Sequence, residues 1–412
     1  MAGRRSWLLA RLRRQIWFRA AVIGAFSVLV AATAGVLARR IPYTFTGDVG
    51  QDAVGTLLGI MASSMLAVTT FSLTAMVGAY GSATQLATPR ATQLLIGDTR
   101  AQNALSTFLG AFIFSMVGIV GLQTHVYGGQ GRVVLLIATV LVIAVVVVTL
   151  LRWIAHLAAF GRMADVIDRV EDAASAAMVA FVRAPCLGGV AAVPVPAGAT
   201  PIHPPVAGYV THVDVDALAD VAQTRGLVIH VASVARTLVH AARPLMHVEG
   251  VVDTHDRARL VRAFTVERHR TFDHDPRLGV IALAEIASRA LAPATNDPGT
   301  AIEVLNALLR TLSHLSGEPP PSIAGRVGVH VPRPTIDDLL DDAFLPFVRD
   351  AVGEAEVAMR TFRIMAALGA TVPDADAPLR RLAAHLHRRI GTRQDDPIAV
   401  DRLDAVYRAD WS

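Results

Sequence analysis

The sequence predicts a mainly α protein with four transmembrane helices, followed by a cytoplasmic stalk helix and an α+β soluble domain. Hydrophobic residues make up 53% of the 412 residues and charged residues only 17%, well below the roughly 25% charged residues of an average soluble domain. Four stretches near the N-terminus each reach the ~20 apolar residues that a spanning helix needs. The rest of the chain alternates charged, apolar and turn-forming side chains, as folded soluble domains do.

Residues 1–155 are predicted to form a four-helix transmembrane domain with a basic N-terminal arm. The second span is the most unusual, because the 37 residues of Ala53–Pro89 include no charged side chain. The other three spans also lack a charge in their middle, which a bilayer core requires of most spanning helices. They are Phe18–Leu37, Ala104–Leu122 and Val133–Leu151.

Arginines before the first span predict its orientation. The positive-inside rule places this end of the chain in the cytoplasm, and an even number of spans returns the C-terminus there. We therefore predict a multi-pass protein of the inner (plasma) membrane, although Arg39 and Arg40 oppose this orientation. A cleavable signal peptide is the alternative, but the apolar stretch is longer than a signal-peptide core. We interpret the following arginines as orienting charges near anionic lipid, not as a nucleic-acid site: Arg4, Arg5, Arg11, Arg13, Arg14 and Arg19.

After the fourth span, residues 156–184 continue a three-four alternation of apolar side chains and predict a stalk helix. This helix packs either within its own subunit or against another copy. Residues 185–205, rich in Pro, Gly and Ala, predict a linker. Residues 206–333 predict an α+β cytoplasmic domain, and residues 334–412 predict a C-terminal helical region.

A stripe of small and hydroxylated residues follows one face of the second predicted span. Spacings of three and four place its members on the same side of a helix. Such a stripe either packs tightly on another helix or lines a polar path through the membrane, and the sequence favours neither. Its members are Thr56, Gly59, Ser63, Ala67, Thr70, Thr74 and Gly78.

The densest polar stretch covers two predicted helices, Leu278–Leu291 and Pro298–Leu315, and the turn between them. Asp297 can cap the second helix, since a proline follows it at the first helical position. One interpretation is a capped turn plus a surface ion pair of Glu285 with Arg289, four residues apart. The other is a polar site formed by Arg270, Asp273, Asp275, Glu285, Arg289, Asn296 and Asp297.

Several kinds of chemistry are excluded or disfavoured by the sequence. It contains no lysine, which excludes Walker A phosphate binding and Schiff-base catalysis. The patterns GxSxG, HExxH and CxxC do not occur, and Cys186, the single cysteine, cannot form an intrachain disulfide. His255 with Asp256, and His269 with Asp273 and His274, are the local clusters of metal-binding side chains. We therefore predict no catalytic residue, no cofactor and no metal, and do not expect an enzyme.

Three segments together resemble one family of uncharacterised bacterial predicted membrane proteins, domain of unknown function 2254. They are Ser63–Val77, the loop Ala87–Arg90, and Arg289–Ile302 with its Asn-Asp-Pro turn. Arg270-Thr271 and the acidic turn that follows match the same family pattern. The resemblance covers nearly the whole chain and implies four spans and a cytoplasmic domain, but no activity.

This sequence departs from the family pattern at three places. Ala292 and Thr88 each replace a serine, and the segment Val234–Val248 lacks the glycines of a G-x-x-V-x-x-G hairpin. If those glycines allow a ligand to approach the backbone, this chain has lost that site. Drift in a surface turn is the simpler explanation.

Two function classes remain. The first is a homo-oligomeric channel or passive facilitator with a cytoplasmic regulatory domain, in which the hydroxyl stripe lines the path. The second is a membrane-anchored sensor or scaffold without a transport path. The expected partners are the lipid bilayer and further copies of the chain, with no nucleic acid. The predicted spans contain no Asp, Glu or Arg in their middles, which disfavours ion-coupled pumping.

Overall fold

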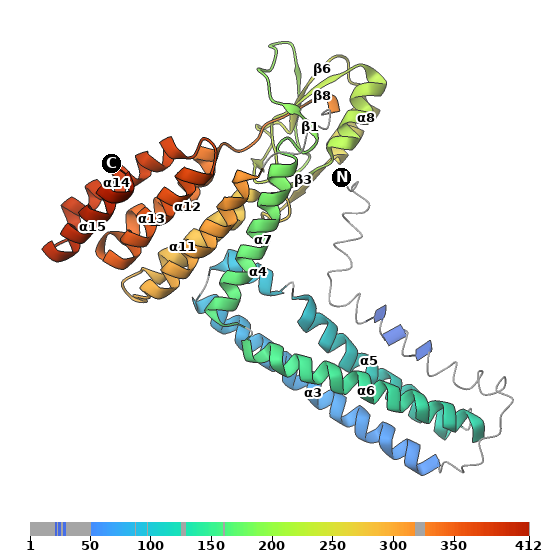
Figure 1. Ribbon diagram of the computed structural model, residues 1–412. Coiled ribbons are helices and arrows are strands. Elements are labelled where there is room, and N and C mark those ends of the chain that lie inside the picture. Colours follow the sequence, from blue (N-terminus) through green and yellow to red (C-terminus); the bar gives the residue numbers. More distant parts are fainter. Residues whose placement is uncertain are drawn as a thin grey trace. The chain divides into compact units, whose positions relative to one another are not determined.

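The computed structural model describes residues 21–22, 24–25, 28–29, 51–86, 88–96, 98–124, 129–159, 161–317 and 326–411. These residues divide into two compact units. The membrane unit comprises the described residues of Trp7–Gln85 and Thr92–Asp165, and the C-terminal unit those of Leu86–Ala91 and Val166–Ser412. Figure 1 shows both units and labels many of their helices and strands.

Three helices of the membrane unit are long and apolar enough to cross a bilayer: Asp52–Gly81, Thr99–Gln123 and Gly131–Ala158. The described residues thus supply three spans, not the predicted four. The predicted span Phe18–Leu37 lies mostly outside the described residues; residues 21–22, 24–25 and 28–29 of it are described, and these are helical. The helices of this unit are α3 (Gln51–Leu86), α4 (Pro89–Ile96, which begins in the C-terminal unit), α5 (Thr99–Gln123) and α6 (Gly129–Ala159).

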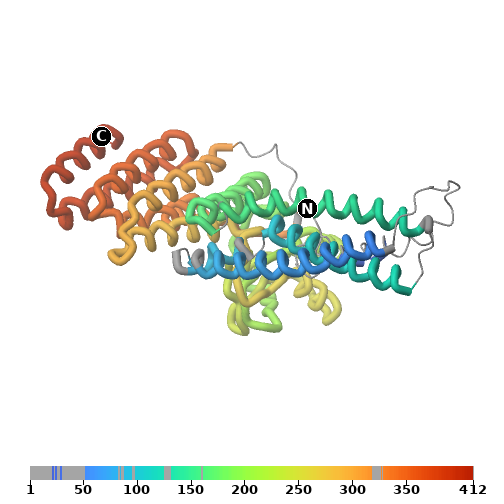
Figure 2. Tube along the Cα trace, turned by 90° about the horizontal axis from the view of Figure 1, so that it is seen from below, coloured from blue at the N-terminus to red at the C-terminus, as the bar shows by residue number. Residues whose placement is uncertain are grey.

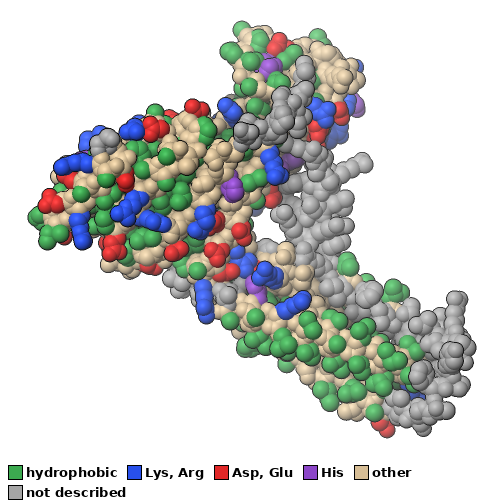
Figure 3. Space-filling model, in the orientation of Figure 1, with side chains coloured by type: hydrophobic (Ala, Val, Ile, Leu, Met, Phe, Trp, Pro, Cys, Tyr) green, Lys and Arg blue, Asp and Glu red, His purple; other side chains and the backbone are tan. Residues whose placement is uncertain are grey.

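Close packing at a glycine brings α3, α5 and α6 together. A Cβ placed on Gly118 of α5 would lie 3.0 Å from Leu58 Cδ1 of α3 and 3.6 Å from Leu135 Cδ1 of α6. Trp153 of α6 is buried and donates its indole N–H to Ser72 Oγ of α3 at 2.8 Å. Hydrophobic side chains gather on the face of the membrane unit that is visible in Figure 3, as expected of helices that face lipid.

Most of α7 (Met163–Arg183) lies in the C-terminal unit and packs on helices of its own chain. This helix covers residues 163–183 of the predicted stalk 156–184, whereas residues 156–159 belong to α6. A Cβ on Gly279 would overlap Ala174 of α7, so only glycine permits this approach. Glu171 accepts two hydrogen bonds from Arg310 at 2.5 and 2.6 Å, and Ser175 Oγ lies 3.3 Å from Thr311 Oγ1.

Two small sheets follow α7. The first has five strands in the order β1-β8-β4-β6-β2, with β1 and β4 parallel to β8, and the second has the order β5-β3-β7. A buried cluster that includes Ile202, Leu218, Ile229 and Val248 forms their core. The elements are β1 (Gly189–Ala191), β2 (Thr200–Ile202), β3 (Gly208–Val213), α8 (Val215–Arg225), β4 (Val228–Val231), β5 (Leu238–Val239), β6 (Met246–Glu249), α9 (Thr254–Arg262), β7 (Phe264–Glu267) and β8 (Arg326–Val331).

Residues 185–205, predicted as a linker, contribute β1 and β2 to the five-stranded sheet. Each strand is three residues long, and each pairs with a strand far away in sequence, β1 with β8 and β2 with β6. The prolines and glycines of this segment predicted a linker, because the strands form only with partners that are distant in the sequence.

Six helices complete the C-terminal unit and stack in two rows. Contacts link α10 with α12 and α12 with α14 in one row, and α11 with α13 and α13 with α15 in the other. Figure 2 shows the later helices of this stack, in orange and red, lying side by side. Their bounds are α10 (Pro276–Ala290), α11 (Pro298–Ser313), α12 (Ile336–Asp350), α13 (Ala355–Thr371), α14 (Asp376–Arg393) and α15 (Pro397–Trp411), with short 3-10 turns η1 (His314–Ser316) and η2 (Ala351–Gly353).

Candidate functional site

The predicted polar residues lie along α10 and at its two ends. Asp275 caps α10 and Asp297 caps α11, and in both helices a proline occupies the start. Proline is favoured at the first helical position because it has no N–H, and an N–H there would have no partner within the helix. The aspartate oxygen accepts a hydrogen bond from another unpaired N–H group of the first turn. At ~1.5 Å per residue, the two ends of the 15-residue α10 are about 22 Å apart. The seven candidates therefore occupy three separate places.

The first place is the buried start of α10. Asp275 is 1% exposed, accepts from the Leu278 amide at 3.3 Å, and pairs with Arg270, whose Nη2 lies 2.7 Å from Oδ2. Asp273, also a candidate, lies in the loop before Asp275; burial lowers the pKa of the neighbouring His274, and the charge of Asp273 offsets part of that effect.

Three further charged residues, which the sequence did not single out, surround this helix start. Arg277 pairs with Asp338 at 3.0 Å and with Asp342, and the hydrogen bonds that Arg277 donates to Asp342 raise the pKa of Arg277. These partners come from α12, more than 60 residues further along the chain, so spacing along α10 could not reveal them.

Arg236 occupies the segment that lacks the family's glycines. Its φ of +91° lies in the region that favours glycine. Its Nη1 is buried without a hydrogen-bond partner in the described chain, and burial, with a further effect from the Arg277 charge, lowers its pKa. Arg236 thus adopts a backbone conformation that glycine adopts more readily.

The second place is the middle of α10. Glu285 pairs with Arg90 at the start of α4, a partner that the spacing along α10 did not suggest. Arg90 belongs to a segment that carries the family resemblance, whereas Glu285 lies four residues before the segment Arg289–Ile302. Both side chains are partly solvent-exposed, 41% for Arg90 and 36% for Glu285.

A cavity of about 610 Å³ opens beside this ion pair, within the C-terminal unit. Arg349 of α12, which lines the cavity, donates to Ser288 Oγ at 3.3 Å and pairs with Asp350 at 2.7 Å. The polar lining of the cavity carries both positive and negative charges, which suits a polar ligand more than a simple anion or cation. The polar residues are Thr88, Glu285, Ser288, Arg289, Asp341, Asp342 and Arg349.

The third place is the exposed turn between α10 and α11. Asn296 adopts a φ of +47°, which asparagine tolerates better than most residues. Asp297 accepts from the Thr300 amide at 3.0 Å and from Thr300 Oγ1 at 2.6 Å, and these two hydrogen bonds lower the pKa of Asp297. Its geometry is that of a helix cap.

The second candidate feature, the hydroxyl stripe of α3, lies on the face of the helix that points away from the bundle. Thr56, Ser63, Ala67, Thr70, Thr74 and Gly78 are exposed and Gly59 is half-buried. A Cβ on Gly59 or Gly78 would meet nothing within 4 Å. At about 100° per residue, the stripe is centred opposite the buried face, which is formed by Val54, Leu58, Met61, Ala62, Met65, Ser72 and Met76.

The stripe hydroxyls are bonded within their own helix. Thr56 donates to Asp52 O at 2.7 Å, Thr70 to Leu66 O at 2.9 Å and Thr74 to Thr70 O at 3.1 Å. Ser63 donates to Gly59 O, also at 3.1 Å. Each oxygen keeps lone pairs that can accept a hydrogen bond from outside the helix.

One group in the described chain could hold a metal ion, formed by Asp253, His255 and Asp256. Arg225 already neutralises both carboxylates, at 3.2 Å from Asp253 and 2.6 Å from Asp256. Asp253 also caps α9, and its hydrogen bond from the Asp256 amide is the main cause of its lowered pKa. These contacts account for the cluster without a metal.

Comparisons with known proteins agree with the predicted resemblance. The chain is 25% identical to the uncharacterized protein Rv1290c of Mycobacterium tuberculosis, over 98% of this chain and 80% of that protein. The same values hold for the uncharacterized protein Mb1321c of Mycobacterium bovis. No solved structure matches the chain. The family described as "Predicted membrane protein (DUF2254)" matches residues 13–367, and the chain belongs to this family of membrane proteins.

Proposed function

We propose that the protein is a homo-oligomeric channel or passive facilitator, with the C-terminal unit regulating it. The observation that carries this proposal is the outward position of the α3 stripe. Small and hydroxylated residues line the face that no described helix of the same chain covers. A second copy could approach that face closely, as small residues allow between membrane helices.

The chemistry of the stripe suits passive conduction. Its hydroxyl oxygens can accept hydrogen bonds from a polar solute, while their own protons are held by the helix. Ion-coupled pumps generally use acidic or basic groups within the membrane, and the stretch Ala53–Pro89 has none. Three described spans, or four if Phe18–Leu37 also crosses, are few for a path within a single subunit.

Cysteine labelling tests the path. In a Cys186→Ser background, single cysteines replace Ser63 and Thr70 on the stripe, with Leu66 and Leu73 as exposed controls beside it. We expect a membrane-impermeant thiol reagent to label the stripe positions and not the leucine positions, because the reactive thiolate forms where water reaches. Silence at both stripe positions would exclude a path along this face.

The oligomeric state is a second test of the same proposal. Mass measurement of the detergent-solubilised protein should give several copies per particle. A particle containing one chain would overturn the channel, because one α3 stripe cannot enclose a path.

The proposal includes the orientation predicted from the arginines, with both termini in the cytoplasm and the chain in the inner membrane. A reporter that is active only in the periplasm, fused after Ser412, should give no signal. A strong signal would place the C-terminal unit in the periplasm and reverse the orientation.

The alternative is a membrane-anchored sensor or scaffold without a transport path. The cavity beside Glu285 and Arg349 favours it, since a polar ligand there would occupy the C-terminal unit. Under this alternative the protein is monomeric or the stripe is unlabelled, so the two tests above discriminate between the functions. Neither function requires a catalytic residue or a cofactor.

A further inference from the structure

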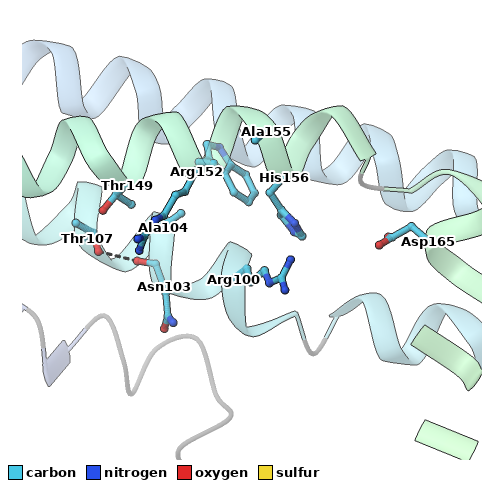
Figure 4. A pocket seen from close by; sticks show the side chains of 10 residues that line it. Arg100, Asn103, Ala104, Thr107, Thr149, Arg152, Ala155, His156 and Asp165 are labelled. Atoms are coloured by element: carbon cyan, nitrogen blue, oxygen red, sulfur yellow. Dashed lines mark hydrogen bonds between the residues drawn. The ribbon is translucent and has the colours of Figure 1, made fainter. Parts of the chain in front are cut away.

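A second cavity lies in the membrane unit between α5 and α6, at the end where α6 leads toward α7. Its volume is about 610 Å³. Figure 4 shows Arg152 extending from α6 toward α5, and Arg100 on α5 below His156. The residues of α5 that carry the argument are Arg100, Asn103 and Thr107, and those of α6 are Thr149, Arg152 and His156.

The two arginines give the cavity a positive charge. Within the described chain, neither the Arg100 nor the Arg152 guanidinium has an ion-pair partner, and both side chains belong to exposed residues. A guanidinium presents several N–H donors in a plane that matches a phosphate.

Nearby carboxylates are engaged elsewhere. Asp98 is 5% exposed, caps α5 by accepting from the Arg100 and Ala101 amides, and lies 2.7 Å from His156 Nε2. Asp165 stands apart from Arg152 at the other end of the cavity in Figure 4, and accepts from the Gly161 amide at 3.5 Å. The guanidiniums of Arg100 and Arg152 therefore remain the principal charged donors for a ligand between the helices.

The hydroxyls and the aromatic wall complete the cavity. Thr107 donates to Asn103 O and Thr149 to Val145 O, both at 2.8 Å, so their protons are not available to a ligand. The hydrogen bond from Trp153 to Ser72 fixes the indole that forms one wall.

Apolar side chains continue from the cavity along the outside of α6. Val145, Val148 and Leu151 are 50%, 49% and 64% exposed, and Leu109 of α5 is 36% exposed. A ligand that combines a phosphate with long apolar chains would satisfy both the arginines and this surface. Free phosphate would satisfy the arginines alone.

We propose that the cavity between α5 and α6 binds the phosphate of an anionic phospholipid, held by Arg100 and Arg152, with the acyl chains along the exposed face of α6. Basic pockets between spanning helices are suited to such headgroups, since the ion pair forms where water is partly excluded. This site is separate from the α3 stripe and does not depend on the channel proposal.

The test uses the full chain, purified and delipidated in detergent, and measures lipid binding by native mass spectrometry. The probes are cardiolipin, phosphatidylcholine and inorganic phosphate at equal concentration. We expect tight binding of cardiolipin, with phosphatidylcholine and phosphate at least tenfold weaker. Arg100→Gln and Arg152→Gln should each weaken cardiolipin binding about fivefold, and the double variant about 25-fold.

Arg132→Gln is the matched control, because Arg132 lies on the same α6 at its opposite end. It should retain the binding of the unmodified protein. The site is overturned if the double variant binds cardiolipin as tightly as the control while its elution volume shows a folded protein. Inorganic phosphate that competes as well as cardiolipin would overturn the lipid and leave a free anion as the ligand.

Discussion

On α3, Thr56 and Thr70 each donate to a carbonyl oxygen of their own helix, whereas at α10 Asp275 and Glu285 pair with arginines from other segments. The two helices lie in different surroundings. Lipid offers no hydrogen-bond partner, so polar groups of a spanning helix are best satisfied within the helix. In the C-terminal unit, partners come from the start of α4, the segment between β7 and α10, and the helix α12.

This difference has an energetic consequence. A group that is satisfied by its own backbone can be removed with little effect, because no distant partner loses its bond. A buried group with distant partners leaves those partners unsatisfied, which costs more than the bond itself. The losses of stability caused by substitutions on the two helices should therefore differ more than the hydrogen-bond distances suggest.

The largest effect is expected at Asp275. Asp275→Ala removes the cap of α10 and leaves Arg270 without its buried partner, so the free energy of unfolding should fall by about 3 kcal/mol. Urea denaturation of the detergent-solubilised chain, followed by circular dichroism, measures this change. Asp275→Asn is the control, since it can still cap the helix and should lose less. A loss below 1 kcal/mol for Asp275→Ala would show that burial does not amplify the pair.

Ser72 is an exception on α3, because its hydroxyl has a partner on another helix. It therefore tests whether distant partners make a polar group more important for stability. Ser72→Ala leaves the buried Trp153 N–H without its acceptor and should destabilise the membrane unit by about 1.5 kcal/mol. Thr70→Ala, two residues earlier on the exposed face, should change stability by less than about 0.5 kcal/mol. Denaturation with increasing SDS in mixed micelles compares them, and equal effects would contradict the distinction between local and distant partners.

The sequence predicted well what depends on nearby residues. Apolar length located the spans later found in α3, α5 and α6, and the Asn-Asp-Pro turn located the start of α11. The strands β1 and β2 were not predicted, since each requires a partner distant in the chain.

The candidate sites show the same limit. Three-four spacing placed the hydroxyl residues on one face of α3, yet could not tell whether that face is covered. At α10 the spacing suggested a pair between Glu285 and Arg289, whereas the partner found, Arg90, is 195 residues away. Arg90 was visible only as part of the family motif, and no signal connected it with Glu285.

An exposed cap should have a smaller, pH-dependent effect. Asp297→Ala should lower the free energy of unfolding by about 1 kcal/mol at pH 7. Because the folded protein lowers the pKa of Asp297, its carboxylate stabilises the fold above the unfolded pKa of about 4, and this stabilisation is lost as the pH falls through the folded value. Denaturation at pH 7 and pH 3 should show the difference between Asp297→Ala and the unmodified protein shrinking. A constant difference would mean that Thr300 bonds the neutral acid equally well.

The smallest effect is expected for the pair of Arg90 and Glu285. Both side chains are more than one-third exposed, so solvent screens their attraction, and a double-mutant cycle with alanine should give a coupling of about 0.5 kcal/mol. A second cycle between Glu285 and Arg289 tests the pairing that the spacing suggested, and should give a smaller value.

The salt dependence of the coupling distinguishes an ion pair that solvent screens from one that is shielded from solvent. At 1 M salt the Debye length falls to about 3 Å, so the coupling of Arg90 with Glu285 should largely disappear. A coupling that persists would mean that the pair is shielded from solvent more than its exposure indicates, as at the buried Asp275. A coupling stronger for Arg289 than for Arg90 would instead make α10 resemble α3, with its polar groups satisfied by neighbours on the same helix.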